Sequence, residues 1–387
     1  MQRINHSTIS TNKKVVRPTL VQVNLSRLRH NFALIKQKVA PAKVMPILKA
    51  NAYGHGLVRI AQFMQEIGAD YVGVAVLEEG MLLRESGITI PILVMGGVLG
   101  NQIPHFINYD LTITASSITK LRGIEEAARE QGVKAKVHLK IDTGMERIGV
   151  HYYNAENFLL ETLRCPHVFV EGVYTHFANA DRPDLIHTRL QLERFQEVLS
   201  FYEKHAIPRP PLVHAANSGA ILQLAEATFD LVRPGILLYG VYPAEDTPKT
   251  IQVQPALSWK SRVVYFKVIT PGHPVGYGST WQTKRNTRAV TVPVGYGDGY
   301  FRSMSHQAQV MIRGKCYPVI GTISMDQIVV DIGQDSAYND DDVLLLGEQD
   351  GVSITAEDMA RWAGTIPYEI LTNINTRVPR VYLGDSK

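Results

Sequence analysis

Short apolar runs alternate with helical patterns along the first two thirds of the chain. After an opening strand "VQVNL" and an amphipathic helix "SRLRHNFALIKQKV", runs of strand length recur, each followed by apolar residues at helical spacing. Counted from Val44 the runs number eight: "VMPILKA", "YVGVAV", "PILVMG", "DLTITA", "AKVHLKID", "VFVEGVYTHF", "LVHAA" and "FDLVRPGIL". Strands that are apolar on both faces are typical of a parallel sheet covered by helices. Over this length the pattern predicts an α/β fold, a TIM-type (β/α)8 barrel at residues 17–245.

The pattern changes after the segment "VYPAEDTPKT", which starts at Val241. Beyond it come alternating apolar and polar residues in long stretches, "ALSWKSRVVYFKVIT", "RAVTVPVGY" and "QVMIRGKCYPVIGTIS", with one late helix around "TAEDMARWAG". Residues 246–387 are therefore predicted to form a mainly β C-terminal domain, which the first strand of the chain could join. The Asp-Gly step of "GYGDGY" predicts a hairpin turn. Residues 1–16 are polar, contain no apolar run and are predicted to be a disordered leader.

Composition and charge exclude several classes of protein. The chain has 387 residues, of which 45% are hydrophobic and 20% charged, and this is an ordinary globular composition. The net charge is +4, and no basic run follows the first few residues, so no nucleic-acid partner is expected. No apolar segment is long enough to span a membrane. Cys165 and Cys316 lie far apart and outside any metal-binding spacing, which argues against a disulfide framework and a zinc site and suits the cytoplasm.

Polar residues close several of the predicted strands. Active sites of such barrels lie at the carboxyl ends of the strands, so these residues are the candidates for one site. Each alone has a structural alternative: a solvated lysine at a strand exit, a core histidine, arginines in structural ion pairs, a helix N-cap or a plain turn. Their common location favours a single functional site. The candidates are Lys49, Arg147, His176, Asn217, Ser218, Arg233 and Gly235.

Two of these loops suggest the ligand. The loops after the seventh and eighth barrel strands often bind phosphate, and here they supply Ser218 at a predicted helix start and Gly235 with Ile236. Lys49 would stand across the mouth of the barrel from this phosphate cradle. A lysine amine in a desolvated, cation-rich pocket loses its proton readily and becomes nucleophilic. The combination predicts a phosphorylated aldehyde held on Lys49 as a Schiff base, and pyridoxal 5'-phosphate is the obvious aldehyde.

Eight motifs in order then resemble one family. They are "VMPILKANAYGHG", "KIDTGMERIGV", "THFANAD", "HAANSGA", "VRPGILLYG", "VGYGDGY", "MDQIVVDI" and "GTIPYEILTNINTRVPRVY". Together, from Arg17 to Tyr382, they closely resemble the alanine racemases, which are pyridoxal-phosphate isomerases built from a barrel and a C-terminal β domain. The resemblance implies interconversion of L- and D-alanine by two-base proton abstraction, D-alanine supply for peptidoglycan, and a homodimer with shared active sites.

The resemblance also implies a role for each matching residue. Lys49 would carry the cofactor and act as one base, and Tyr277 of the partner subunit would act as the other. Arg233, together with His176 when charged, would favour the neutral amine of Lys49 and the phenolate of Tyr277. Lys140 matches a position where carbamylation can place a negative group beside an arginine. The cofactor-binding residues would be Lys49, Tyr53, His176, Asn217, Ser218, Arg233, Gly235, Ile236 and Tyr368. The substrate-binding residues would be Arg147, Tyr296 and Met325.

Three other functions share part of this pattern. A broad-specificity or serine racemase would share almost every residue and differ in pocket width. A decarboxylase on a related barrel would place an acidic residue where Arg233 stands, and a non-catalytic cofactor carrier would have no need of Tyr277. The chain also departs from the family pattern, with Thr322 where many members have arginine and Gly297 in place of a usual alanine.

Overall fold

The computed structural model describes residues 16–384, and these form two compact units. The parallel unit comprises Asn24–Ala256, Pro367–Thr372 and residues 383–384, and the β unit comprises residues 16–23, Leu257–Ile366 and Asn373–Tyr382. Almost all of the predicted leader lies outside the described residues. No helix within residues 16–384 is both long and apolar enough to cross a membrane, and Cys165 and Cys316 are free thiols.

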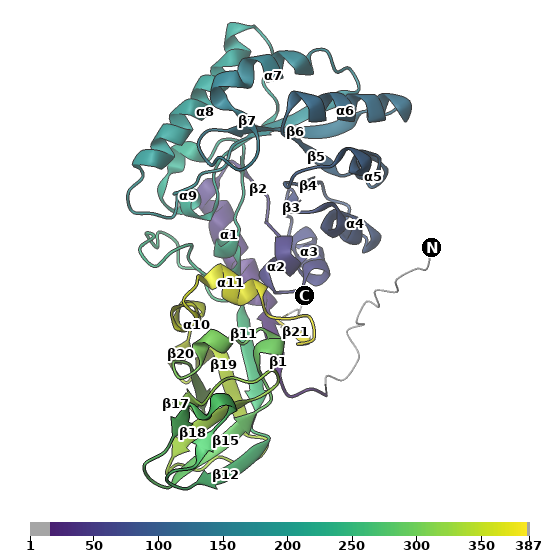
Figure 1. Ribbon diagram of the computed structural model, residues 1–387. Coiled ribbons are helices and arrows are strands. Elements are labelled where there is room, and N and C mark those ends of the chain that lie inside the picture. Colours follow the sequence, from purple (N-terminus) through teal and green to yellow (C-terminus); the bar gives the residue numbers. More distant parts are fainter. Residues whose placement is uncertain (1–15, 385–387) are drawn as a thin grey trace. The chain divides into compact units, whose positions relative to one another are not determined.

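The parallel unit is built on strands that fall on the eight predicted runs (Figure 1). One sheet has the order β3-β4-β5-β6-β8-β9, and β10 pairs in parallel with β2. Backbone hydrogen bonds link the two sheets, because Ile47 bridges to Gly73 of β3 and Asp230 N–H donates to the carbonyl of Val213 in β9. The predicted parallel α/β sheet is therefore confirmed. The strands are β2 (Lys43–Val44), β3 (Val72–Val74), β4 (Ile92–Val94), β5 (Thr112–Ala115), β6 (Ala135–Asp142), β8 (Val168–Tyr174), β9 (Leu212–His214) and β10 (Leu231–Val232), with the short β7 (Val150–His151) beside β6.

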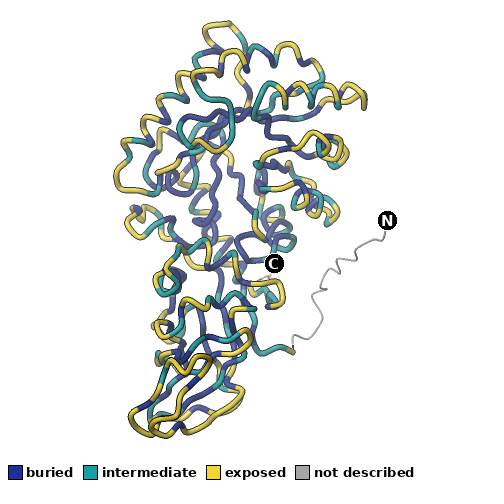
Figure 2. Tube along the Cα trace, in the orientation of Figure 1, coloured by how far each residue is buried: buried dark blue, intermediate teal, exposed yellow. Residues whose placement is uncertain are grey.

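Helices follow the strands and supply the second apolar layer. In α1 the buried residues Leu25, Leu28, Phe32, Ile35 and Val39 recur at helical spacing, and Asn24 caps its first turn. Figure 2 shows the strands as a largely buried inner layer with exposed positions on the surrounding helices. The helices are α1 (Leu25–Val39), α2 (Lys49–Tyr53), α3 (Leu57–Glu66), α4 (Leu77–Glu85), α5 (Ile103–Asn108), α6 (Ile118–Glu130), α7 (Ala155–Thr162), α8 (Ile186–Lys204), α9 (Ser218–Gln223) and α11 (Pro367–Thr372). Single 3-10 turns are η1 (Gly100–Gln102), η2 (Tyr152–Asn154), η3 (Ala225–Ala227) and η4 (Ile236–Tyr239).

The β unit is organised around one sheet, which has the order β12-β15-β18-β17-β16-β19-β11-β1-β21, with β20 beside β19. Alternation is visible in β11, where Leu257, Trp259 and Ser261 are buried and the residues between them are not. The strands are β1 (Leu20–Asn24), β11 (Leu257–Arg262), β12 (Tyr265–Ile269), β15 (Thr287–Val292), β16 (Gln309–Ile312), β17 (Lys315–Ile320), β18 (Ile328–Gly333), β19 (Asp342–Gln349), β20 (Val352–Ile354) and β21 (Arg380–Leu383). The hairpin β13 (Pro274–Val275) and β14 (Trp281–Gln282), the helix α10 (Ala356–Ala363) and the turns η5 (Tyr277–Ser279), η6 (Tyr296–Asp298) and η7 (Arg302–Met304) complete it.

Local backbone chemistry divides two of the predicted long strands. The stretch from Ala256 to Thr270 forms β11 and β12, and the stretch from Gln309 forms the hairpin of β16 and β17. That hairpin turns at Arg313 and Gly314, which have φ of 50° and 74°, as a two-residue turn of mirror-image type requires. The hairpin predicted at "GYGDGY" is wrong. The flanking strands β15 and β16 do not pair with each other, and the motif forms the 3-10 turn η6.

Candidate active site

The parallel unit gathers most of the predicted site residues at the carboxyl ends of its strands. Lys49 follows β2, Lys140 lies in β6, Arg147 follows β6, and His176 follows β8. The β9–α9 junction supplies Asn217 and Ser218, and the chain after β10 supplies Arg233, Gly235 and Ile236. Tyr53 ends α2, and Tyr368 lies in α11, which belongs to the same unit. The other predicted site residues, Tyr277, Tyr296 and Met325, belong to the β unit.

Lys49 opens a turn with an unusual backbone. Ala50, Asn51 and Ala52 have φ of 53°, 57° and 53°, so α2 is a left-handed turn. L-amino acids adopt this conformation at a cost of about 1–2 kcal/mol per residue. The carboxylate of Glu79 accepts hydrogen bonds from the backbone N–H of Ala50 at 2.7 Å and of Ala75 at 2.9 Å, and so ties the turn to the start of α4. Glu79 was not among the site residues predicted from the sequence, because it lies in an ordinary helix, α4.

The environment of Lys49 favours its neutral amine. The side chain is half-buried, and burial lowers its pKa, as does the nearby charge of Arg147. The charge of Glu79 acts in the opposite direction and does not outweigh these effects. Because the neutral amine is the nucleophilic form, the site holds a lysine that can attack an aldehyde.

The predicted phosphate cradle is assembled around Gly235. The hydroxyl oxygen of Ser218 accepts a hydrogen bond from the N–H of Gly235 at 2.9 Å, and Asn217 caps α9 through the N–H of Ala220. A Cβ on residue 235 would lie 2.6 Å from the Tyr53 hydroxyl oxygen, so only glycine fits there. The Tyr53 ring in turn lies 6.1 Å from the Tyr368 ring, centroid to centroid. The hydroxyls of Tyr53 and Ser218 therefore lie beside the glycine backbone at Gly235, and a group of hydroxyls next to exposed backbone fits a phosphate.

Arg233 is buried and held by four acceptors. One terminal nitrogen donates to Nδ1 of His214 at 2.8 Å, and the other donates to the carbonyls of Thr175 at 2.7 Å and Ala215 at 2.9 Å. The second nitrogen also contacts Nδ1 of His176 at 3.3 Å. Burial lowers the pKa of Arg233 to about 10, while Tyr174 acts in the opposite direction. The guanidinium thus stays charged at neutral pH and can only donate hydrogen bonds.

One electrostatic expectation is corrected by this arrangement. Burial lowers the pKa of His176 well below its ordinary value, and the charges of Arg233, Lys140, Arg147 and Lys49 lower it further. His176 is therefore neutral near pH 7, and the expected contribution of a charged His176 to the cation cluster is wrong. The cations around Lys49 are the arginines, because a histidine gives up its proton more easily than they do.

Lys140 and Asp142 form the wall next to Arg147. Lys140 is 3% exposed, its ammonium nitrogen donates to the carbonyl of Ile141 at 2.9 Å, and burial together with Arg233 lowers its pKa to about 7. Burial raises the pKa of Asp142, but backbone hydrogen bonds from Gly144, Glu146 and Met145 outweigh it, so that this pKa lies below its ordinary value. The same carboxylate accepts from the N–H of Arg147 at 3.2 Å. Asp142 therefore fixes the loop that carries Arg147.

In the β unit the predicted residues lie on exposed turns. Tyr277 begins η5 with 73% of its surface exposed, Tyr296 begins η6 with 43% exposed, and Met325 precedes β18 with 52% exposed. Thr322 donates from its hydroxyl to the carbonyl of Tyr277 at 2.9 Å. Thr322, which stands where the resemblance leads us to expect an arginine, thus holds the main chain of the predicted base with a short side chain.

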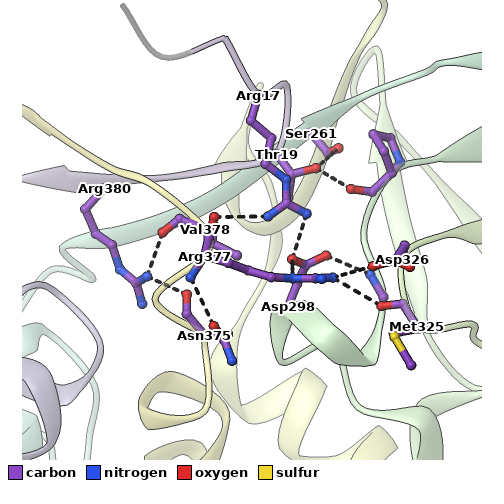
Figure 3. A network of polar contacts seen from close by, with 12 residues as sticks. Arg17, Thr19, Ser261, Asp298, Met325, Asp326, Asn375, Arg377, Val378 and Arg380 are labelled. Atoms are coloured by element: carbon purple, nitrogen blue, oxygen red, sulfur yellow. Dashed lines mark hydrogen bonds and ion pairs between the residues drawn. The ribbon is translucent and has the colours of Figure 1, made fainter. Parts of the chain in front are cut away.

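A polar network supports two of these turns (Figure 3). Asp298 is fully buried, and its carboxylate pairs with Arg17 and with Arg377, each at 2.7 Å. Arg377 also reaches Asp326 at 2.8 Å, next to Met325. A Cβ on Gly297 would lie 2.7 Å from a terminal nitrogen of Arg377, so the glycine makes room for this arginine. Arg377 was not among the predicted site residues, although it lies in the motif "TRVPRVY".

Comparisons with known proteins match one family along nearly the whole chain. The family model described as "Alanine racemase, N-terminal domain" matches residues 23–243, and "Alanine racemase, C-terminal domain" matches residues 256–382. "Alanine racemase" of Carboxydothermus hydrogenoformans is 44% identical over 370 residues, covering 95% of this chain and 100% of the relative. "Alanine racemase 2" of Caldanaerobacter subterraneus is 42% identical over 371 residues, covering 95% of each chain.

Solved structures give the same answer in three dimensions. The alanine racemase of Clostridium difficile 630 superposes with a TM-score of 0.91 at 36% identity, covering 96% of this chain and 97% of that one. A second structure of that protein, in complex with cycloserine, has a TM-score of 0.89 at 33% identity, covering 97% of this chain and 98% of that one. Both domain models and near full-length relatives match in order along the chain. The chain therefore belongs to the alanine racemase family.

Proposed function

We propose that this protein is a pyridoxal-phosphate-dependent alanine racemase that interconverts L- and D-alanine and supplies D-alanine for peptidoglycan. One observation carries the proposal. In a chain of this family, the half-buried Lys49, whose pKa is lowered, lies in the same unit as the groups around Gly235 that fit a phosphate. In the same unit we infer that the ring of parallel strands, joined by the pairing of β10 with β2, is a closed (β/α)8 barrel.

The residues of the parallel unit fit the cofactor and divide the work of holding it. Pyridoxal phosphate, when bound, supplies an electron-withdrawing ring that acidifies the hydrogen on the α-carbon of an attached amino acid. Lys49 would hold the aldehyde carbon, and Ser218, Tyr53, Tyr368 and the amides at Gly235 and Ile236 would hold the phosphate. Arg233 would donate a hydrogen bond to the ring nitrogen, with Asn217 and His176 beside it. Because Arg233 keeps its own proton, it orients the ring without protonating it.

Two groups would move protons at the α-carbon. Racemisation by inversion requires a base on each face of that carbon, since a single base would have to leave one face and return on the other. We assign Lys49 to one face and Tyr277 to the other. The lowered pKa of Lys49 increases the share of its amine that is neutral and able to accept a proton.

The β-unit residues would come from the partner of a homodimer. Tyr277, Tyr296 and Met325 are all more than two-fifths exposed in the chain. Large side chains with this exposure are suited to completing a site on a second subunit. Bulk at Tyr296 and Met325 would restrict the pocket. Tyr368 and Tyr296 would leave room for a methyl group and crowd a longer side chain, although one extra methylene is discriminated by only about 1–3 kcal/mol.

Arg147 would bind the substrate carboxylate or the phenolic oxygen of the cofactor, and we propose that Lys140 is carbamylated beside it. The reaction joins the neutral lysine nitrogen to the carbon of carbon dioxide and releases one proton. A lysine with a pKa near 7 has the neutral amine that this step requires. The resulting carbamate would add a negative charge next to Arg147.

A deuterium experiment tests the reaction directly. The purified protein, loaded with pyridoxal phosphate, is incubated with L-alanine in deuterium oxide, and optical rotation and α-deuterium are followed together. Loss of rotation with deuterium in both enantiomers is expected. If neither changes while the cofactor is bound, the protein is a carrier or acts on another amine. Parallel runs with serine and lysine measure how broad the substrate range is.

Mixing two inactive variants tests the shared site. Lys49→Ala removes the cofactor-holding base and Tyr277→Phe removes the other, so each homodimer is inactive. In a shared-site dimer, a mixture after subunit exchange contains one intact site per heterodimer, which is about a quarter of wild-type activity for equal mixing. If the mixture stays inactive while heterodimers form, the two residues act within one chain.

A further inference from the structure

Behind Arg233 a line of buried polar groups crosses three neighbouring strands of the parallel unit. Nδ1 of His214, in β9, accepts from Arg233 at 2.8 Å. Nε2 of His214 contacts Nδ1 of His138, in β6, at 2.8 Å. Nε2 of His138 lies 3.4 Å from a carboxylate oxygen of Glu171, in β8, and the described chain gives this nitrogen no hydrogen-bond partner. Both histidines are fully buried.

Hydrogen-bond capacity fixes where the protons of both histidines lie. Arginine can only donate, so Nδ1 of His214 must accept, and the ring carries its single proton on Nε2. His214 then donates to Nδ1 of His138, which must accept in turn. His138 therefore carries its proton on Nε2, the nitrogen that faces Glu171. A doubly protonated His138 would place two donors against each other, so both rings are neutral. Burial lowers the pKa of each ring, in agreement with this pattern.

The surroundings hold the rings and the carboxylate in place. A Cβ on Gly172 would lie 2.7 Å from Nδ1 of His138, so the glycine next to Glu171 provides the space for this ring. Tyr174 stacks on His214 with centroids 4.7 Å apart and planes at 6°. Glu171 accepts from the Tyr71 hydroxyl at 2.5 Å. Burial raises the pKa of Glu171, but the contacts with His138 and Tyr71 outweigh it, so the group is a carboxylate at neutral pH.

We propose that Glu171 is a positioning residue for Arg233, which it reaches through His138 and His214 by fixing the proton on each ring. The carboxylate stabilises the Nε2–H form of His138, and this form in turn selects the Nε2–H form of His214. Without the negative charge, His138 can move its proton to Nδ1, and His214 then carries its proton on Nδ1. That proton would point at the guanidinium of Arg233, whose nearest nitrogen lies 2.8 Å from Nδ1 of His214. Because both nitrogens would then be donors, Arg233 would have to move. The kinetic consequence rests on the proposed function, whereas the proton pattern does not.

Nitrogen-15 NMR of the histidines tests the pattern in the holoenzyme prepared with pyridoxal phosphate. Long-range proton–nitrogen correlations distinguish protonated from bare ring nitrogens, and His138→Gln and His214→Asn assign the signals. The wild type is expected to show protonated Nε2 and bare Nδ1 in both rings at neutral pH. A proton on Nδ1 of His214, or a doubly protonated His138, would overturn the proposal whether or not the protein racemises alanine.

Matched variants test the role of the carboxylate. Glu171→Gln removes the charge, and Glu125→Gln is the control, because Glu125 also pairs with a histidine, His167, and its side chain is likewise 17% exposed. The expected result for Glu171→Gln is a His214 signal with mixed protonation, a shifted cofactor absorption band, and kcat lower by about three- to tenfold, as for a screened charge several ångströms away. KM for alanine should change less.

A second variant separates charge from packing. Tyr71→Phe removes a hydrogen bond to Glu171 but leaves the carboxylate, so it should keep the wild-type pattern on both histidines. Wild-type signals, band and kcat in Glu171→Gln would refute the positioning role. An enzyme that shows the predicted proton pattern but no alanine racemisation would instead refute the proposed function alone.

Discussion

Replacing Glu79 by alanine should release the turn that carries Lys49 without unfolding the parallel unit. Four residues in a row, Ala50 to Tyr53, have φ between 51° and 57°. At about 1–2 kcal/mol each, this left-handed turn stores roughly 4–8 kcal/mol. Glu79 accepts three hydrogen bonds from backbone N–H groups, and the two shorter ones, from Ala50 and Ala75, are worth about 1.5–3 kcal/mol each, since the acceptor is charged. They therefore offset a large share of the strain.

The expected result is a selective loss of cofactor binding. In Glu79→Ala the turn relaxes toward ordinary backbone angles, Lys49 leaves its place, and pyridoxal phosphate affinity falls by about ten- to a hundredfold, or roughly 1.4–2.8 kcal/mol. Titration of the apoprotein with pyridoxal phosphate, followed by the visible band of the lysine-bound cofactor, measures this. Glu78→Ala is the matched control, because Glu78 occupies the same first turn of α4 and is exposed.

A rescue variant makes the reasoning refutable. Glycine adopts positive φ without steric penalty, so Ala50→Gly should recover part of the lost affinity in the Glu79→Ala background. In the wild-type background it should gain little, because Glu79 already holds the turn. Equal cofactor affinity in Glu79→Ala and Glu78→Ala, or no rescue by the glycine, would refute the view that Glu79 maintains the strained turn.

Three further changes have expected outcomes. Gly297→Ala should displace Arg377 and lower the free energy of unfolding by about 1–3 kcal/mol in urea titrations, whereas Gly100→Ala, which meets nothing within 4 Å, should be neutral. Thr322→Val should lower kcat by about three- to tenfold and leave the cofactor absorption band unchanged, because the carbonyl of Tyr277 loses a hydrogen bond of ordinary strength. An unchanged kcat would show that Thr322 does not affect the site. Lys140 titrates near pH 7 when folded and near 10.5 when unfolded, so the unfolded chain binds more protons between these values. We therefore compare the free energies of unfolding of the wild type and of Lys140→Met in bicarbonate-free buffer. Their difference should rise by about 1 kcal/mol per pH unit over this window, and a difference that does not change with pH would contradict the lowered pKa of Lys140.

The sequence was sufficient to predict the site residues that lie at the ends of strands. Lys49, Ser218 and Arg233 each close an apolar run, and parallel strands bring their carboxyl ends to one edge, so their association could be predicted. His138 and Lys140 show the limit of this reasoning. They stand two residues apart in β6 and so share one face, yet only Lys140 was chosen, because a histidine inside an apolar run gives no sign of its partners.

What the sequence could not provide is the set of long-range contacts that determine charge and backbone angle. Glu171 lies more than thirty residues from His138 and about sixty from Arg233, and only the register of β6, β8 and β9 places them in one line. The neutral state of His176 has the same origin, since its pKa is lowered first by burial and then by charged groups, chiefly Arg233, from other strands and loops. The strain at Ala50 is equally invisible, because alanine ordinarily favours a right-handed helix and its left-handed conformation is held here by Glu79 of α4. Residue type and spacing therefore predict the groups that would touch the cofactor. The groups that determine their protonation and backbone angles depend on long-range contacts between strands and helices, and the variants at Glu79 and Glu171 test this second set.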